Sequence, residues 1–224
     1  MKTSSSIRRS PIHDCLEELN PVWVEIHNMK VPLRFKDAAS ETQLKAALSL
    51  CDLSCLPKVS VKGPASLAWL AQAGILVPES VYGYRSLGDG GLVIRTDRQE
   101  VFLEDSPSSH KVSTFERELN SHPLGVYVVL RQDASFFLTG ARSNAVLREI
   151  CGVDFSQPPN GVVMTRVAGV SCMVLAEKPA AFRFWLDSSY GSYLWETLLE
   201  IVRDQGGDAI GLDTLIPRSD MPTQ

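Results

Sequence analysis

Short apolar runs, separated by tight turns, dominate the hydrophobic pattern along this chain. Two of them, Val22–Ile26 and Met29–Phe35, flank the dipeptide His27-Asn28 and predict a β-hairpin. Similar patterns predict strand pairs at Leu92–Glu104, Gly125–Leu138 and Val162–Ala176, and a further strand at Ala181–Leu186. Strands that follow one another through tight turns pair antiparallel, whereas parallel strands need long crossover connections. The pattern therefore predicts an α+β fold with antiparallel sheets.

Segments with helical periodicity lie between the predicted strand pairs. In Ser40–Cys51 the apolar residues share one helix face, and a capping box at Ser40 predicts the helix start. A second capping box predicts a helix from about Ser113. The last predicted helix runs from about Ser189 to Asp204 and ends at Gly206-Gly207. Between the strands, the stretch Gly83–Gly91 predicts a loop.

Two stretches of the chain share a pattern of strand, glycine turn and helix. Gly63 in "VSVKGPASLAWL" matches Gly140 in "FFLTGARSNAVL", and a serine, an alanine and a leucine after each glycine match at the same spacing of 77 residues. Because glycine permits a sharp exit from a strand, the repetition predicts two similar strand–turn–helix (ferredoxin-like) units, at about 20–125 and 126–215. We expect residues 1–10 to form a disordered tail and residues 216–224 a loose one.

Each glycine turn also raises the question of anion binding, since N–H groups at a helix start can hold a phosphate. Neither turn has the spacing of a dinucleotide-binding fingerprint or of a P-loop, and each contains a single glycine. We therefore interpret both turns as packing features.

Composition and charge narrow the classes of partner. The chain of 224 residues is 44% hydrophobic with a net charge of −4, so it has no basic surplus for nucleic acid, and no apolar run is long enough to predict a membrane span. Arg8-Arg9 is followed by polar and acidic residues instead of the apolar stretch of an export signal. The odd number of cysteines, without metal-ligand spacing, predicts reduced thiols in a cytoplasmic protein and no metal site.

Several segments, in order, resemble the aminomethyltransferase (glycine-cleavage T-protein) superfamily. "CDLSCLPKVSVKGPASLAWL" resembles its D-x-S segment followed by a strand, a glycine turn and a helix, and "ASFFLTGARSNAVL" resembles its second such turn. "YGYRSLGDGG" lies where that family has a Tyr-led strand and a Gly-Gly turn, and "FRFWLDSSYGSYLWETLLEI" looks most like the gamma subunit of heterotetrameric sarcosine oxidase. The resemblance covers roughly residues 11–215. It implies a T-protein-like fold that binds tetrahydrofolate in a central channel, here without the C-terminal barrel of the family.

The same resemblance shows where this sequence departs from active T-proteins. In the family, an acidic pair that takes part in the chemistry follows the Gly-Gly turn after two residues. Here Gly90-Gly91 are followed by Leu92-Val93 and then by Ile94-Arg95. Isoleucine cannot transfer a proton. The glutamate that helps to hold the pterin in the family also has no counterpart in "LDSSYGSYLW". The resemblance therefore implies a scaffold without the known catalytic groups.

The candidate ligand contacts are residues expected near the centre of such a fold. They are Tyr82, Arg85, Arg95, Arg131 and Arg166. Tyr82 would provide an aromatic wall for a pterin ring, or pack as an ordinary strand tyrosine. Arg85 and Arg95 would balance the glutamate tail of a folate or remain solvated surface charges. Arg131 and Arg166 would bind ligand or pair with Asp133. Trp195 falls outside the apolar stripe of the last helix, so we expect it to face outward at a subunit interface; the alternative is a place in the core.

Three functions remain open from the sequence. The first is a non-catalytic subunit that docks against a larger flavin-dependent oxidase subunit or a copy of itself. The second is a stand-alone tetrahydrofolate-dependent aminomethyltransferase, in which Asp89 or Asp97 replaces the missing acid. The third is a small-molecule-binding protein that uses the same channel for another ligand.

Overall fold

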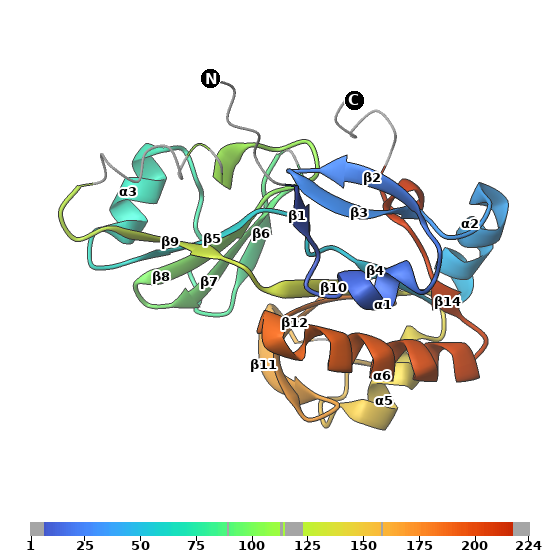
Figure 1. The fold of residues 1–224 in the computed structure, drawn as a ribbon. Helices are drawn as coiled ribbons and strands as arrows, with labels where there is room; N and C mark the ends of the chain where they lie inside the picture. The colour runs from blue at the N-terminus through green and yellow to red at the C-terminus, as the bar shows by residue number, and fades with distance from the viewer. Residues whose placement is uncertain (1–6, 89, 113, 115–122, 158, 217–224) are drawn as a thin grey trace, which may run out of the picture.

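Two large β-sheets that face each other form the centre of the structure (Figure 1). The computed structural model describes residues 7–88, 90–112, 114, 123–157 and 159–216. The five-stranded sheet has the order β6-β7-β8-β5-β9, the six-stranded sheet the order β11-β12-β13-β10-β4-β14, and a small third sheet the order β1-β3-β2. The strands are β1 (Arg8–Arg9), β2 (Val22–Ile26), β3 (Met29–Arg34), β4 (Ser49–Asp52), β5 (Lys58–Lys62), β6 (Tyr84–Ser86), β7 (Leu92–Asp97), β8 (Glu100–Glu104), β9 (Tyr127–Arg131), β10 (Ala134–Thr139), β11 (Val162–Val167), β12 (Val170–Lys178), β13 (Ala181–Leu186) and β14 (Asp208–Ala209). The predicted α+β class with antiparallel sheets is confirmed.

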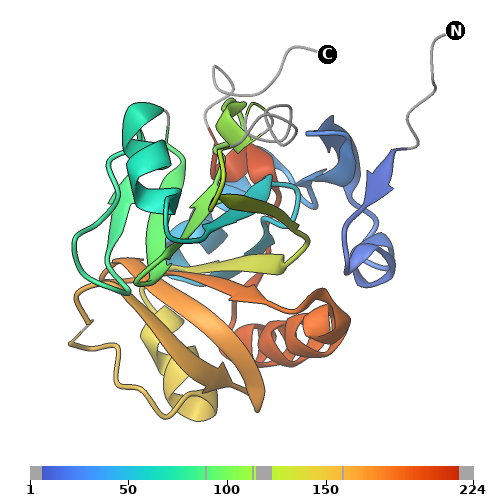
Figure 2. The same cartoon turned by 90° about the vertical axis from the view of Figure 1, so that its left-hand side faces the viewer.

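Helices cover the outer faces of the two large sheets. Figure 2 shows α3 beside the five-stranded sheet and α5 and α6 beside the six-stranded sheet, on opposite sides of the molecule. The helices are α1 (His13–Glu17), α2 (Ala38–Ala47), α3 (Ser66–Gln72), α5 (Ser143–Ile150) and α6 (Gly191–Asp204), with short 3-10 turns at Ser188–Tyr190 and Leu212–Thr214. In α6, Leu194, Leu198 and Val202 recur at helical spacing and are buried in the main core. Gly206, at φ +76°, ends this helix as predicted.

The internal repeat is visible in the strand order. A strand, a glycine turn, a helix and three further strands give β5-α3-β6-β7-β8 in one sheet and β10-α5-β11-β12-β13 in the other, with the same spatial order of strands. The strand that precedes each set crosses over: β4 pairs with β10, and β9 pairs with β5. The two sheets therefore exchange a strand, and they do not divide at the predicted boundary of 125/126.

The two glycine turns pack against the chain that enters these crossed strands. Gly63 and Gly140 have φ of +109° and +113°, in the left-handed region that favours glycine. A Cβ at Gly140 would collide with the backbone of Ala47–Leu48, which leads into β4, and a Cβ at Gly63 would collide with the carbonyl of Gly125, which leads toward β9. The N–H of Ala65, at the start of α3, donates to that Gly125 carbonyl at 3.1 Å. These turns hold protein backbone, which confirms their interpretation as packing features.

The helix predicted over Ser40–Cys51 is shifted and shortened. It begins at Ala38, because the Asp37 side chain accepts a hydrogen bond from the N–H of Ser40 at 3.0 Å and caps the helix. It ends at Ala47, because the next residues form β4, which lies between β10 and β14 in the six-stranded sheet. The buried environment of that sheet overrides the helical periodicity of the apolar residues.

Other local predictions differ from the structure in similar ways. The expected loop Gly83–Gly91 contains the edge strand β6. The expected hairpin Gly125–Leu138 is opened, because β9 and β10 belong to different sheets. Within the tail predicted for residues 1–10, Arg8 and Arg9 form β1, which pairs in parallel with β3, and residues 1–6 lie outside the described residues. The hairpins at 22–34 and 162–178 are confirmed. The helix start predicted at Ser113 lies outside the described residues.

Candidate functional site

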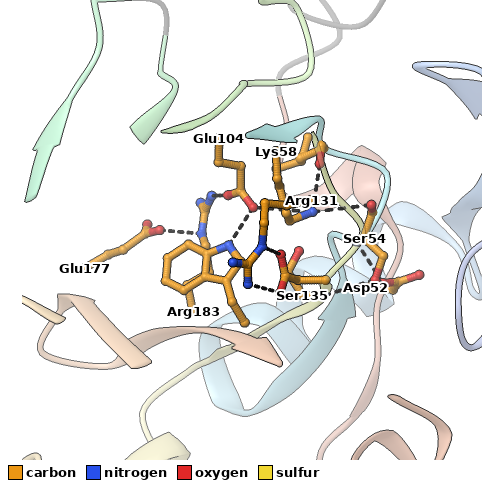
Figure 3. Close-up of polar contacts among 11 residues, drawn as sticks. Asp52, Ser54, Lys58, Glu104, Arg131, Ser135, Glu177 and Arg183 are labelled. Carbon is orange, nitrogen blue, oxygen red and sulfur yellow. Dashed lines mark hydrogen bonds and ion pairs between the residues drawn. The ribbon is translucent and has the colours of Figure 1, made fainter. Parts of the chain in front are cut away.

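A buried carboxylate connects the two large sheets at their centre. Glu104, at the end of β8, is fully buried, and its two oxygens accept hydrogen bonds from Arg183 Nη1 and Trp185 Nε1, both at 2.6 Å (Figure 3). The ammonium of Lys58, directly opposite on β5, lies 3.5 Å from the same carboxylate. Arg183 also forms an ion pair of 2.6 Å with Glu177. Burial alone would lower the pKa of Arg183, but the carboxylates of Glu104 and Glu177 raise it above its usual value.

Apolar side chains pack beside this carboxylate between the sheets. Ile94 on β7 is fully buried there and belongs to one cluster with Phe102, Met173 and Trp185. The rings of Phe102 and Trp185 meet edge to face, with centroids 5.7 Å apart. Ile94 occupies the position at which the family resemblance implies an acid. The structure thus places an aliphatic side chain in apolar surroundings at this position.

A groove of about 280 Å³ opens beside this cluster, between the two sheets. Its walls include the side chains of Phe102, Trp185 and Met173, and its rim includes Tyr82 and Arg131. Tyr82 has φ of +66°, an uncommon conformation for a residue other than glycine. Its N–H donates to the carbonyl of Arg95 at 2.7 Å, and its own carbonyl accepts from Val162, so the tyrosine links the edges of the two sheets. Two of the predicted ligand contacts, Tyr82 and Arg131, therefore lie in one groove.

A second, larger pocket of about 540 Å³ adjoins this groove and shares Arg131 and Asp133 with it. Arg131 binds Asp133 through two hydrogen bonds, of 2.9 and 2.7 Å, and this carboxylate raises the pKa of Arg131 above its usual value. Arg8 and Arg9 also line the pocket, and no ion pair joins either of them to another residue in the described part of the chain. The pocket therefore has a surplus of positive charge.

The remaining predicted contacts lie elsewhere. Arg95 points its guanidinium at backbone carbonyls, including that of Arg98 at 2.9 Å, so it braces a turn. Arg85 and Arg166 are exposed on the edge strands β6 and β11, and neither lines the groove. Trp195 was expected to face outward, but it is only 1% exposed and its ring packs edge to face on Phe136 at 5.4 Å. The wide apolar face of α6, buried under α1 and the sheet, includes this position.

The D-x-S segment has a structural role that the sequence alone did not indicate. Asp52 is buried and accepts hydrogen bonds from Ser10 Oγ at 2.6 Å and from the N–H of Ser54 at 2.9 Å. The hydroxyl of Ser54 in turn accepts from the N–H of Ser135 at 3.1 Å (Figure 3). Burial raises the pKa of Asp52 above its usual value. The motif thus ties the N-terminal segment to β4 and β10.

Sequence reasoning missed the Glu104 cluster as a whole. Its members are single charges within apolar strands, at Lys58, Glu104 and Arg183, and such charges are ordinarily read as strand ends or solvated faces. The one available signal was Arg183, which interrupts a strand between Phe182 and Phe184 and so predicts a paired buried charge.

Comparison with known proteins supports the fold inferred from the resemblance. No family model matches the chain. It is 23% identical over 239 residues to the aminomethyltransferases of Bacillus cereus and Bacillus anthracis, and the match covers 97% of this chain and 65% of those relatives. The chain thus spans just under two thirds of the length of the curated relatives that it matches.

Two solved structures share the architecture. The glycine cleavage system aminomethyltransferase T from Bartonella henselae aligns with a TM-score of 0.70 and 16% identity, over 93% of this chain and 61% of that one. A chain of the heterotetrameric sarcosine oxidase from Corynebacterium sp. U-96 aligns with a TM-score of 0.61 and 17% identity, over 76% of this chain and 93% of that one. The chain therefore has a T-protein-like fold.

No helix in the part of the chain that the structure describes has the length and apolar character needed to cross a bilayer. All five cysteines are free.

Proposed function

We propose that this chain is a non-catalytic subunit, or scaffold, with a T-protein-like fold, in a complex that oxidises amines or handles one-carbon groups. The observation that carries the proposal is the environment of Ile94. This residue stands where the family resemblance implies a reactive acid, and it is fully buried among Phe102, Met173 and Trp185. The side chain at this position can neither take up a proton nor stabilise a developing cation.

The comparison with sarcosine oxidase supports the choice of complex. The aligned chain of that heterotetramer is matched over 93% of its length, so the fold of nearly that whole chain is present here. By analogy, the partner of this chain would be a larger flavin-dependent oxidase subunit, with a second copy of the chain as the alternative. Five free thiols fit the reducing cytoplasm, which we propose as the compartment.

Tetrahydrofolate is the ligand that the family resemblance implies, and the groove between the sheets fits part of it. The groove has two aromatic walls and the thioethers of Met164 and Met173, which suit a flat heteroaromatic ring. Its volume of about 280 Å³ is small for a drug-sized ligand, so it suits the ring system alone. We propose that a bound folate would place its ring here, beside Tyr82.

The alternative of a stand-alone transferase needs another acid near that ring. Asp97 is exposed at the turn between β7 and β8 and does not line the groove, and Asp89 lies outside the described residues. Glu100, Asp133 and Asp187 do line the groove, and two of them are paired, Glu100 with Lys62 and Asp133 with Arg131. We favour the scaffold because the position of Ile94 itself carries no acid. The third function, binding of another small molecule, would use the same groove.

One experiment separates these functions. The purified chain is supplied with tetrahydrofolate and an aminomethyl donor, and folate binding is measured in parallel by calorimetry. The scaffold proposal predicts no transfer above background, and turnover would refute it. If folate occupies the groove, Tyr82→Ala weakens binding while Tyr193→Ala, which removes an exposed tyrosine from α6, leaves it unchanged. Absence of binding at millimolar folate would refute the folate proposal. It would not affect the scaffold proposal, which the transfer assay tests.

A further inference from the structure

Strand β9 lies at an open edge of the five-stranded sheet. It pairs with β5 over all five of its residues without a register shift, and no other strand in the described part of the chain pairs with its far side. Three of its side chains are large, apolar and exposed: Tyr127 (59%), Val129 (44%) and Leu130 (45%). An edge of this kind presents a row of unpaired backbone N–H and C=O groups beside apolar side chains, which is the template for adding a strand.

The other edges of the large sheets carry the features that ordinarily prevent such pairing. The edge strand β6 has only three residues and carries the exposed Arg85. The edge strand β14 has two residues, one of which, Asp208, is held in ion pairs with Lys36 and Arg203. The edge strand β11 carries the exposed Arg166 near its end. By contrast, β9 has no charge before its last residue, so it is the edge that is least protected.

The cation-lined pocket described above lies at the C-terminal end of β9. Leu130, Arg131 and the two residues that follow line this pocket together with Arg8 and Arg9. Since Asp133 already binds Arg131, Arg8 and Arg9 retain their charge without an ion-pair partner among the described residues. A segment that adds to β9 and continues past its end would therefore meet two free guanidinium groups, which favour carboxylates.

We propose that β9 and this pocket together bind an extended segment of a partner protein, with apolar residues along β9 and acidic residues against Arg8 and Arg9. Every strand pair within this sheet is antiparallel, so the added segment runs antiparallel to β9 and its acidic residues precede its apolar ones. The inference rests on the proposed function, because it names the surface by which such a subunit would dock.

A second copy of the chain fits this surface less well. In an antiparallel pairing of β9 with its own copy, the copy would bring Tyr127 and the segment around Leu124 toward Arg8 and Arg9. Neither Tyr127 nor Leu124, the residues of the copy that would lie nearest, carries a carboxylate. Charge complementarity therefore favours a partner with an acidic segment.

Fluorescence anisotropy with defined peptides tests the proposal on the full chain. The probe has three glutamates followed by alternating valine and threonine, about ten residues in all, long enough to follow β9 into the pocket. Its controls are the same composition in reverse order, a version with lysine in place of glutamate, and a version N-methylated at alternate valines. We expect saturable binding of the probe and at least roughly tenfold weaker binding of each control.

Charge reversal in the protein completes the test. The double variant R8E/R9E should bind the acidic probe roughly tenfold more weakly than the wild type and should bind the lysine version more tightly. Arg85→Glu, on the opposite edge of the same sheet, should change neither affinity. The proposal is overturned if the acidic probe shows no saturable binding, if the N-methylated version binds equally well, or if R8E/R9E has no effect. A concentration-dependent dimer that Leu130→Lys abolishes would overturn it in favour of a second copy. Transfer activity, which would refute the scaffold proposal, leaves each of these readouts unchanged.

Discussion

Glu104 and Arg183 join the two large sheets through a hydrogen bond of 2.6 Å between Oε1 and Nη1. Because Glu104 is fully buried, its removal leaves Arg183, Lys58 and the indole of Trp185 without their common acceptor. Breaking a buried pair by removing one partner typically costs about 3–5 kcal/mol. We therefore expect Glu104→Ala to lower the free energy of unfolding by about that amount, measured by urea denaturation.

The same two strands supply a control for this prediction. Glu100 on β8 pairs with Lys62 on β5 at 3.0 Å, but both side chains are partly exposed. Exposed ion pairs contribute less than about 1 kcal/mol, so Glu100→Ala should cost little. Equal effects of the two substitutions would show that the Glu104 cluster is not what holds the sheets together.

The repeat, the antiparallel strands and most turns could be predicted from the sequence because each depends on local pattern. Gly63 and Gly140 stand at equivalent places in the two units, and their spacing is visible in the sequence alone. The exchange of β4 and β9 between the sheets could not be predicted, because it depends on which distant strand offers a free edge. The connection between β9 and β10 is short, so the sequence pattern predicts a hairpin. Only tertiary packing places the two strands in different sheets.

The candidate site was predicted in part for the same reason. Tyr82 and Arg131 reach one groove, whereas Arg95 is used to brace backbone carbonyls and Trp195 is buried under α1. Strand position indicates which face a side chain takes, but it does not show whether the side chain already has a partner. The Glu104 cluster was missed because its members are far apart in sequence and belong to two sheets.

Replacing Ile94 tests whether the central position tolerates an acid. We expect Ile94→Asp to lower the free energy of unfolding by about 3–5 kcal/mol, since an unpaired carboxylate would be buried among Phe102 and Trp185. The smaller truncation Ile94→Val should cost only about 0.5–1.5 kcal/mol. Both are measured by urea denaturation. A well-tolerated Ile94→Asp would mean that water or a polar partner reaches this position, and it would weaken the case for a scaffold.

The glycine turns predict a contrast between two alanine substitutions. Gly140→Ala combines a φ of +113° with a collision between the new Cβ and the backbone of Ala47–Leu48. Backbone strain should cost about 1–3 kcal/mol of stability, and overpacking should cost a similar amount. The thermal midpoint of unfolding should therefore fall markedly. Gly74→Ala, at φ +76° with no atom within 4 Å of the new Cβ, carries the conformational strain alone, about 1–2 kcal/mol. Equal losses at the two positions would contradict the close approach of the turn to the chain entering β4.

The pH dependence of stability should report the buried state of Asp52. Burial raises the pKa of this carboxyl in the folded protein above the 3.8 usual for aspartate, so folding favours the protonated form. The stability of the wild type relative to Asp52→Asn should therefore rise as the pH falls from 7 through the folded pKa toward about 4. Urea denaturation of both proteins at a series of pH values measures this difference. A difference that is flat, or that falls with the pH, would show that the hydrogen bonds from Ser10 and Ser54 outweigh burial.

Asp37 provides the control of opposite sign for that measurement. Hydrogen bonds from the side chain and the N–H of Ser40 lower the pKa of Asp37, the exposed cap of α2, below its usual value. The stabilisation from a lowered pKa is present above the unfolded pKa and is lost as the pH falls through the folded one. The stability of the wild type relative to Asp37→Asn should thus fall when the pH drops below about 4. The stability of the wild type relative to Asp52→Asn should instead rise as the pH falls from 7 toward about 4. Opposite slopes for the two aspartates would separate the effect of burial from that of hydrogen bonding, since both carboxylates accept serine donors and only Asp52 is buried.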